Sequence, residues 1–322
     1  MAEDRFRQSS HFRDWIFTEE GLQKRRIDVN QEFTKVVRQR LLEDLALQNK
    51  DASDNDLPPT LDQNEEMELV NYYACQLNAL SSTMSLPTHI RATATLFFKR
   101  FYLTSSVMEY NPKIISFTSL YLATKTNDHY LPIEHFCKNL PKTTPDQVLE
   151  YEFNVCQALN WDLFIWLPFR PLQGFLLDFQ VAIPETPVET LFECHDQTKR
   201  FLVETLHSDM YFYHSPSIIA LSGIYHTNPS LCINYLQAKS INSTHDLIVS
   251  ISSALDSTKN ARLDREKAKD CGKKLYFCMD PLKKKNSSLY LKRKAMEEET
   301  SLGNKKQKLS NSTDQLDVNP FA

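Results

Sequence analysis

Glycine is the residue whose scarcity most constrains this chain, since only 5 of its 322 residues are glycine. Average usage is about four times higher. Glycine readily adopts the positive φ angles that tight hairpins and phosphate-binding loops require, so a fold rich in such turns is excluded. The chain is therefore expected to be mostly helical.

The composition predicts a globular protein with a sizeable core. Hydrophobic residues make up 41% of the chain and aromatic residues 11%, so disorder throughout is excluded. No apolar stretch approaches the roughly 18 residues of a membrane span, and the first residues are too polar for a signal peptide. The seven cysteines never lie closer than seven residues apart. These features favour a soluble intracellular protein, without direct membrane contact, whose thiols stay reduced.

Charge is divided unevenly along the chain. Residues 1–258 hold 21 Lys and Arg against 32 Asp and Glu, a balance of −11, whereas residues 259–322 hold 16 against 9, a balance of +7. Because few apolar residues follow residue 291, this basic tail is expected to be disordered. It contains three basic clusters, which are Lys283, Lys284 and Lys285, then Lys292, Arg293 and Lys294, and finally Lys305, Lys306 and Lys308.

Three roles are open for the basic tail. Short Lys/Arg clusters on a flexible chain fit the acidic groove of a carrier, which predicts a nuclear import signal and a location in the nucleus. The alternative is a solvated tail without a function. Direct nucleic-acid binding is disfavoured, because aromatic residues that could stack on bases are nearly absent from the tail.

Residues 1–60 are expected to form an N-terminal helix and an acidic linker. Thr18 can cap a helix that Glu19 and Glu20 open, and apolar residues follow at mixed spacings of three and four. The segment 49–59 is acidic and ends in two prolines, which places a boundary near residue 60. We expect the helix to pack on the rest of the chain, because a solvated helix would not need so many aromatic residues. They are Phe12, Trp15, Phe17 and Phe33.

Residues 61–161 are expected to form a compact unit of five helices. The third helix follows Asn111 and is apolar nearly all the way round, which is typical of a central helix surrounded by others. Four prolines stand where each can lie in the first turn of the helix it opens. They are Pro87, Pro112, Pro132 and Pro145.

The chain contains a weak internal repeat. A shift of 104 residues lays residues 111–115 (NPKII) over residues 215–219 (SPSII). Both segments have a polar cap, a proline that opens a helix and an apolar body, as two copies of one central helix would. A second unit would then span residues 162–258, followed by a C-terminal helix and the basic tail in residues 259–322. The sequence predicts an all-α protein with two stacked helical repeats.

Sequence signatures of catalysis and cofactor binding are missing. The chain has no GxGxxG, GxxxxGK[ST], GxSxG or HExxH motif. The nearest metal-like histidine spacings join His129 with His135 and His207 with His214, and neither pair is accompanied by a CxxC or carboxylate motif. A cysteine nucleophile would need a Cys/His signature that we do not find. We expect a protein that is not an enzyme and uses no metal and no cofactor.

Two ionisable residues stand out by their helical surroundings. Glu152 has apolar residues one turn before it and one turn after it, and a carboxylate on a buried face needs a partner. Lys125 ends the apolar third helix. Alternatively, Glu152 lies at the edge of its face and Lys125 is a cation that favours the C-terminal end of the helix dipole. Periodicity alone leaves both alternatives open.

Several segments resemble the cyclin family, whose members are tandem five-helix repeats. Three segments resemble the first cyclin box, namely residues 91–103 (RATATLFFKRFYL), 107–112 (VMEYNP) and 120–126 (LYLATKT). The cyclin H branch is resembled by residues 11–26 (HFRDWIFTEEGLQKRR), 148–161 (VLEYEFNVCQALNW) and 169–179 (FRPLQGFLLDF). The likeness covers roughly residues 11–260.

The resemblance implies roles for particular residues. The family's Lys and Glu that bind the kinase partner fall on Lys125 and Glu152, where they would hold the mobile regulatory helix of the kinase. The acidic pair that follows this lysine in the family is Asn127 and Asp128 here, which leaves only Asp128 for an acidic contact. The substrate-docking motif of mitotic cyclins is missing. The minimal degradation-box pattern at residues 38–41 (RQRL) is better explained as a helix face.

The resemblance also implies a function, that of the non-catalytic cyclin subunit of the CDK-activating kinase. Its partners would be a cyclin-dependent kinase catalytic subunit, an assembly-factor subunit and the core of transcription factor IIH (TFIIH). The complex would phosphorylate activation segments of cell-cycle kinases and the C-terminal repeats of RNA polymerase II. The alternatives are a cyclin C-like subunit of a transcriptional mediator kinase and a helical adaptor like transcription factor IIB. The acidic balance of residues 1–258 disfavours the DNA contact that such an adaptor makes.

Overall fold

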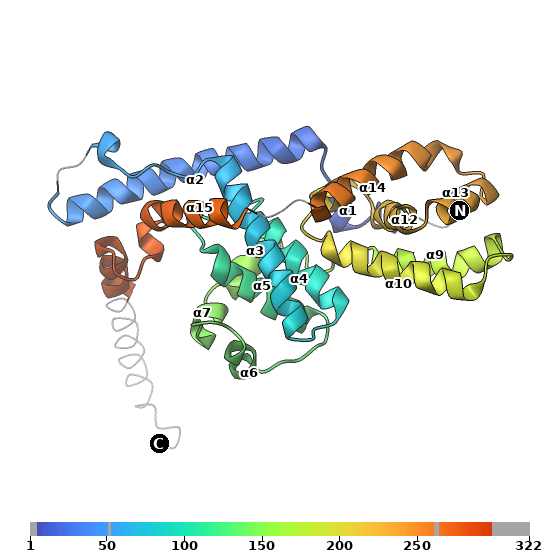
Figure 1. The fold of residues 1–322 in the computed structure, drawn as a ribbon. Coiled ribbons are helices and arrows are strands. Elements are labelled where there is room, and N and C mark those ends of the chain that lie inside the picture. The colour runs from blue at the N-terminus through green and yellow to red at the C-terminus, as the bar shows by residue number, and fades with distance from the viewer. Residues whose placement is uncertain (1–4, 51–52, 261–263, 298–322) are drawn as a thin grey trace, which may run out of the picture.

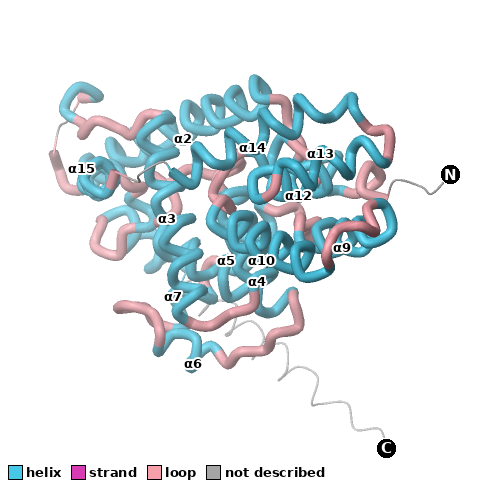
Figure 2. Tube along the Cα trace, turned by 45° about the vertical axis from the view of Figure 1, so that its right-hand side comes forward, coloured by secondary structure: helices cyan, strands magenta, loops and turns pink. Residues whose placement is uncertain are grey.

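The computed structural model describes residues 5–50, 53–260 and 264–297, and this part of the chain contains helices, turns and loops but no strand (Figures 1 and 2). The all-α prediction is confirmed. None of the described helices combines the length and the apolar character that crossing a bilayer demands. The first repeat contains α3 (Gln63–Thr83), α4 (Thr88–Phe101), α5 (Pro112–Thr126), α6 (Ile133–Lys138), α7 (Pro145–Leu149) and α8 (Glu152–Ala158).

Helix α5 is the centre of the first repeat, and it packs against α3, α4, α7 and α8. Its N-cap Asn111 accepts a hydrogen bond from the backbone N–H of Lys113, and Pro112 occupies the first helical position. Pro145 also lies in the first turn of its helix, whereas Pro87 and Pro132 are N-cap residues just before theirs.

The last helix of the repeat is divided into α7 and α8, although the sequence pattern predicts one helix. The side chain of Thr118 in α5 donates a hydrogen bond to the backbone oxygen of Val148, at 3.0 Å. In a continuous helix that oxygen would accept from the N–H of Glu152. The division therefore makes Glu152 the first residue of a new helix.

The second repeat is built around α12, which packs against α9, α10, α13 and α14. Pro216 occupies the first position of α12 as Pro112 does in α5, so the shift of 104 residues aligns two central helices. Gly223 lets α12 approach α10 closely, because a Cβ here would lie 3.0 Å from side-chain atoms of Leu202 and Thr198. The repeat contains α9 (Phe169–Ala182), α10 (Val188–Glu204), α11 (Met210–Tyr213), α12 (Pro216–Thr227), α13 (Pro229–Ala238) and α14 (His245–Asn260).

Two N-terminal helices, α1 (Ser10–Trp15) and α2 (Glu19–Leu47), pack on the repeats. Thr18 caps α2 by accepting a hydrogen bond from the N–H of Gly21. Trp15 is buried, and the backbone N–H of Phe17 donates to the backbone oxygen of Phe212 in the second repeat, at 2.8 Å. The long α2 then runs beside the first repeat and α15 (Arg265–Cys278) (Figure 1).

Order extends further toward the C-terminus than the composition predicts. After α15, the carboxylate of Asp280 is fully buried and binds Arg40 of α2 at 2.5 Å, and the backbone N–H of Asp280 donates to the backbone oxygen of Met108. The Nζ atom of Lys283 lies 4.9 Å from the ring centre of Tyr110. This segment has little apolar surface of its own and is ordered by the surface of its neighbours. The tail residues from 298 onward lie outside the described residues.

Candidate functional site

Lys125 and Glu152 meet at the surface of the first repeat. Lys125 lies in the last turn of α5 and Glu152 at the start of α8, and their side chains form an ion pair. The Lys125 ammonium also lies 5.3 Å from the ring centre of Tyr121. The two charged side chains are 40% and 21% exposed, so a partner can still reach them.

The end of α5 fixes where Lys125 and its neighbours point. The backbone N–H of His129 donates to the oxygen of Thr124 at 2.9 Å, which closes the helix by a bond that spans five residues. Asp128 has the left-handed conformation (φ 56°) that such an ending requires, and its side chain is exposed. Lys125 at a C-terminus and Glu152 at an N-terminus both complement the dipoles of their helices. This surface could therefore offer Lys125, Glu152 and Asp128 together to one partner.

Large apolar side chains in the segment on either side of Glu152 are exposed to solvent. Phe153 follows Glu152 directly, is 63% exposed, and packs edge-on against Trp161, with 5.7 Å between ring centres. Trp161 is 60% exposed and has a left-handed backbone (φ 58°), which is unusual for a bulky residue. Leu149 and Phe164 are exposed as well.

These exposed side chains are typical of a protein interface, where aromatic residues supply much of the binding energy. Sequence analysis did not identify them. The available signal was the aromatic content of the segment that surrounds Glu152. We refer to Lys125, Glu152, Leu149, Phe153, Trp161 and Phe164 as the α5/α8 surface.

A second charged cluster, which sequence analysis also missed, joins the two repeats. Lys99 of α4 is fully buried, and its Nζ atom lies 2.7 Å from the carboxylate of Asp209 and 2.5 Å from the backbone oxygen of His207. Arg26 of α2 binds the same carboxylate with two bonds of 2.8 Å. Burial opposes ionisation of Asp209, but Lys99 and Arg26 outweigh it and hold the pKa of Asp209 well below its usual value. We call Lys99, Asp209 and Arg26 the junction cluster.

Arg100, the next residue of α4, lies beside the junction cluster and is almost fully buried. Its guanidinium lies 4.6 Å from the ring centre of Trp15 and 3.7 Å from the carboxylate of Asp162, which also accepts a hydrogen bond from the Trp15 indole. Burial and the Arg100 charge lower the pKa of His11 to about 2, so His11 stays neutral and accepts the N–H of Trp166. Lys99 and Arg100 thus bind the first repeat to the second repeat and to α1.

The other predicted sites are the basic clusters, one of which lies outside the described residues, and the degradation-box pattern. Of the three basic clusters, 283–285 and 292–294 are described and 305–308 is not. Within the degradation-box pattern, Arg38 pairs with Asp54 and Arg40 with Asp280, so both arginines serve the fold. Among the described residues, no three His, Cys, Asp or Glu side chains are grouped to hold a metal ion.

Comparison with known sequences agrees with this architecture. Residues 46–164 match the cyclin N-terminal domain and residues 167–265 match the cyclin C-terminal domain. The chain is 65% identical over 321 residues to cyclin mcs2 of Schizosaccharomyces pombe, an alignment that covers 100% of both chains. The chain belongs to the cyclin family, as its sequence motifs predict.

Two solved structures are similar to most of the chain. One is a chain in the structure of the CAK complex from Chaetomium thermophilum bound to ATP-γ-S, with a TM-score of 0.79 and 25% identity over 94% of this chain and 96% of that chain. The other is a chain in the yeast TFIIK (Kin28/Ccl1/Tfb3) complex, with a TM-score of 0.63 and 29% identity over 79% of this chain and 100% of that chain.

Proposed function

We propose that this cyclin is the regulatory subunit of a CDK-activating kinase and binds its kinase through the α5/α8 surface. The observation that carries the proposal is the combination of an accessible Lys125–Glu152 pair with exposed aromatic rings next to it. The similar chains belong to kinase complexes named CAK and TFIIK, which supports the same assignment.

In this proposal the cyclin contributes a rigid surface and no reacting group. The aromatic side chains bury against the kinase, and the charged pair fixes the position of the kinase's regulatory helix. Once that helix is placed, the kinase's own Lys and Glu can pair and its activation segment can order. Because the α5/α8 surface is built from α5, the end of α7, α8 and the segment that follows α8, it is positioned before the kinase arrives, which reduces the entropic cost of binding.

Charge reversal tests the proposal. Lys125→Glu and Glu152→Lys each break the pair, whereas the double variant restores an ion pair with the opposite orientation. If the kinase binds these charges in their wild-type positions, all three variants should bind the purified kinase at least tenfold more weakly than the wild type does in a calorimetric titration. A double variant that binds like the wild type would contradict the proposal. Lys24→Glu, on an exposed position of α2, is the matched control.

The same proposal includes an assembly-factor subunit and the TFIIH core as further partners, with cell-cycle kinases and the polymerase II repeats as substrates. The TFIIK complex contains Tfb3 beside Kin28 and Ccl1, which supports a third subunit. Purification of the tagged chain from its own cells, followed by mass spectrometry, should recover a kinase, such a factor and TFIIH subunits. Recovery of a mediator-type kinase or of promoter DNA would instead favour one of the two alternatives.

A location in the nucleus, directed by the basic clusters, is part of the proposal. Lys283 packs on Tyr110 and Arg293 lies 5.5 Å from the ring centre of Tyr290, so both described clusters are partly engaged by contacts within the chain. Alanine substitution at residues 305, 306 and 308, or at 292–294, should shift the chain toward the cytoplasm in cells that lack its partner subunits. Substitution of Lys142 and Lys138 is the matched control, and an unchanged nuclear level in every variant would contradict an import role.

A further inference from the structure

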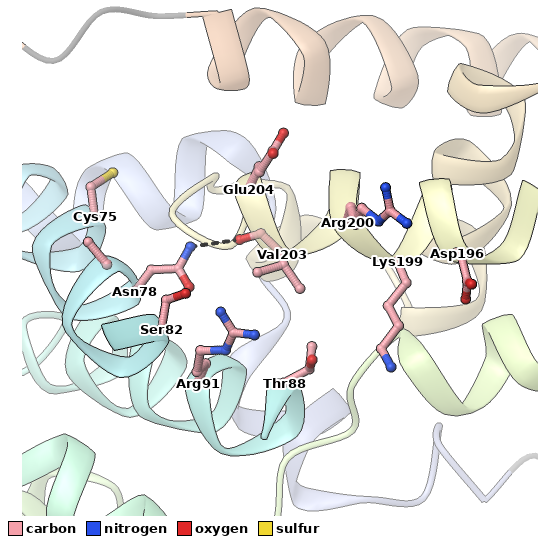
Figure 3. A pocket seen from close by; sticks show the side chains of 11 residues that line it. Cys75, Asn78, Ser82, Thr88, Arg91, Asp196, Lys199, Arg200, Val203 and Glu204 are labelled. Atoms are coloured by element: carbon pink, nitrogen blue, oxygen red, sulfur yellow. Dashed lines mark hydrogen bonds between the residues drawn. The ribbon is translucent and has the colours of Figure 1, made fainter. Parts of the chain in front are cut away.

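A cleft lies between the two repeats, away from the α5/α8 surface. Its volume is about 580 Å³, and it is walled by one face each of α3, α4 and α10 (Figure 3). The amide of Asn78 in α3 donates a hydrogen bond to the backbone oxygen of Val203 in α10, at 3.0 Å, and so connects the repeats at the cleft. Both repeats therefore contribute walls to the cleft, and this hydrogen bond links them.

The cleft has an excess of available positive charge. Arg91 of α4 and Lys199 and Arg200 of α10 line it, and within the described part of the chain none of the three takes part in an ion pair. Two acidic residues also line the cleft, and one of them, Glu204, pairs with a cation outside it. Asp196 lies 3.3 Å from a ring nitrogen of His195, and the carboxylate of Glu204 lies 2.9 Å from the ammonium of Lys259, and neither of these two partners lines the cleft.

Two residues that line the cleft each have a buried polar atom without a hydrogen-bond partner within the described part of the chain. These atoms are Nε of Arg91, a donor, and Oδ1 of Asn78, an acceptor. Groups of this kind are costly to leave unpaired, so they point to a ligand that both accepts and donates. The side chains of Ser82 and Thr88 line the same cleft and can do either.

We propose that this cleft binds a phosphorylated segment of a partner protein. Two arginines and a lysine suit a phosphoryl group, which accepts several charge-assisted hydrogen bonds at once. The acceptor on Asn78 suits a backbone N–H of the same peptide. A nucleic acid fits less well, because its backbone needs an extended basic stripe, whereas these three cations lie within one cleft on an acidic body.

The cleft would then be a docking site that both repeats form, and its occupation would leave the α5/α8 surface free for the kinase. A partner or substrate that already carries phosphate would be held by the cyclin while the kinase acts elsewhere on it. Binding at the cleft does not depend on the proposed kinase function, since every residue that forms it belongs to this chain.

The test uses the free full-length chain and no kinase. The probe is a fluorescein-labelled heptapeptide library with a central phosphoserine and randomised flanks, and anisotropy measures binding at two salt concentrations. Parallel probes carry serine or glutamate in place of the phosphoserine, and a hexamer of thymidylate serves as the nucleic-acid probe. We expect the phosphopeptides to bind at least tenfold more tightly than any other probe, and more weakly at high salt.

Substitutions locate the site. Lys199→Ala with Arg200→Ala removes two exposed charges and should weaken phosphopeptide binding at least tenfold, and Arg91→Gln should weaken it severalfold with an unchanged melting temperature. The matched control, Lys24→Ala with Lys35→Ala on α2, removes the same charge and should bind normally. Equal losses in both double variants, tighter binding of the oligonucleotide, or full displacement by an equal concentration of inorganic phosphate would each overturn the proposal.

Discussion

The junction cluster and the Lys125–Glu152 pair use the same chemistry, but their lysines differ in burial. In the junction cluster the Lys99 side chain is 1% exposed and binds Asp209 beside Arg26. At the α5/α8 surface the lysine of the pair is 40% exposed. Removing one partner of a buried pair leaves an uncompensated charge, whereas an exposed charge is solvated by water. The junction cluster therefore stabilises the fold, whereas the surface pair is available to bind a partner.

Breaking the junction cluster should have the largest effect. Asp209→Ala leaves Lys99 and Arg26 without their shared carboxylate, so it should lower the free energy of unfolding by about 3 to 5 kcal/mol. Chemical denaturation measures this change. Asp54→Ala, which removes the exposed partner of half-buried Arg38, should stay near the wild type. Equal effects of the two substitutions would refute the distinction between the buried and exposed pairs.

Glu66 is a buried carboxylate with no cationic partner among the described residues, and its pH dependence sharpens the comparison. Burial raises the pKa of Glu66 to about 7 from an ordinary value of 4.5, although the Ser106 hydroxyl donates a hydrogen bond to it. The folded state therefore holds a proton that the unfolded state releases. This contribution is complete below pH 4.5 and is lost as the pH rises to about 7, at up to about 1.4 kcal/mol per pH unit.

Glu66→Gln should remove this dependence, because glutamine is neutral at every pH. Compared with the wild type, the variant should become relatively more stable by about 2 to 3 kcal/mol between pH 4.5 and pH 8. Denaturant titrations at both pH values give the difference. Glu32→Gln, on an exposed position of α2, is the control, and parallel profiles for Glu66→Gln and the wild type would argue against a neutral Glu66.

Trp15, which packs on Arg100, should give a smaller effect. Trp15→Phe keeps an aromatic ring against Arg100 but removes the N–H that donates to Asp162 at 3.1 Å. We expect a loss of about 1 kcal/mol in the free energy of unfolding, as for one hydrogen bond. Trp161→Phe at the α5/α8 surface should cost nothing measurable. Thermal melting of both variants measures the two changes. A larger loss of stability for Trp161→Phe than for Trp15→Phe would mean that Trp161, and not Trp15, stabilises the fold.

The smallest effect on stability is expected at the surface pair itself. Lys125→Ala and Glu152→Ala should each change the free energy of unfolding by no more than about 1 kcal/mol. Kinase binding should nevertheless fall by at least tenfold, because each residue would be an anchor of the interface. Calorimetric melting of the free variants beside kinase titration measures both quantities. Variants that melt at a lower temperature yet bind the kinase normally per folded molecule would show that the pair stabilises the fold and does not bind the kinase.

Much of the fold follows from local sequence patterns. The capping Thr18, the helix-opening Pro112 and Pro216 and the apolar bodies that follow them predict α2, α5 and α12, because each pattern acts within one or two helical turns. The division between α7 and α8 could not be predicted, since it depends on a hydroxyl from Thr118, a residue of another helix. The role of Lys125 and Glu152 in kinase binding stays a prediction from the resemblance.

By itself, the sequence determined the helical class, the two repeats, the two central helices and the choice of Lys125 and Glu152 as residues of interest. Only the tertiary structure decided that these two side chains pair at the surface among exposed aromatic rings. It alone brought Lys99 to Asp209, 110 residues further along the chain, buried Asp280 beneath Arg40, and left Arg91 facing an open cleft. The physical reason is that burial and charge pairing depend on which helices pack together. The periodicity of one helix predicts which of its faces is buried, but not which helix covers that face.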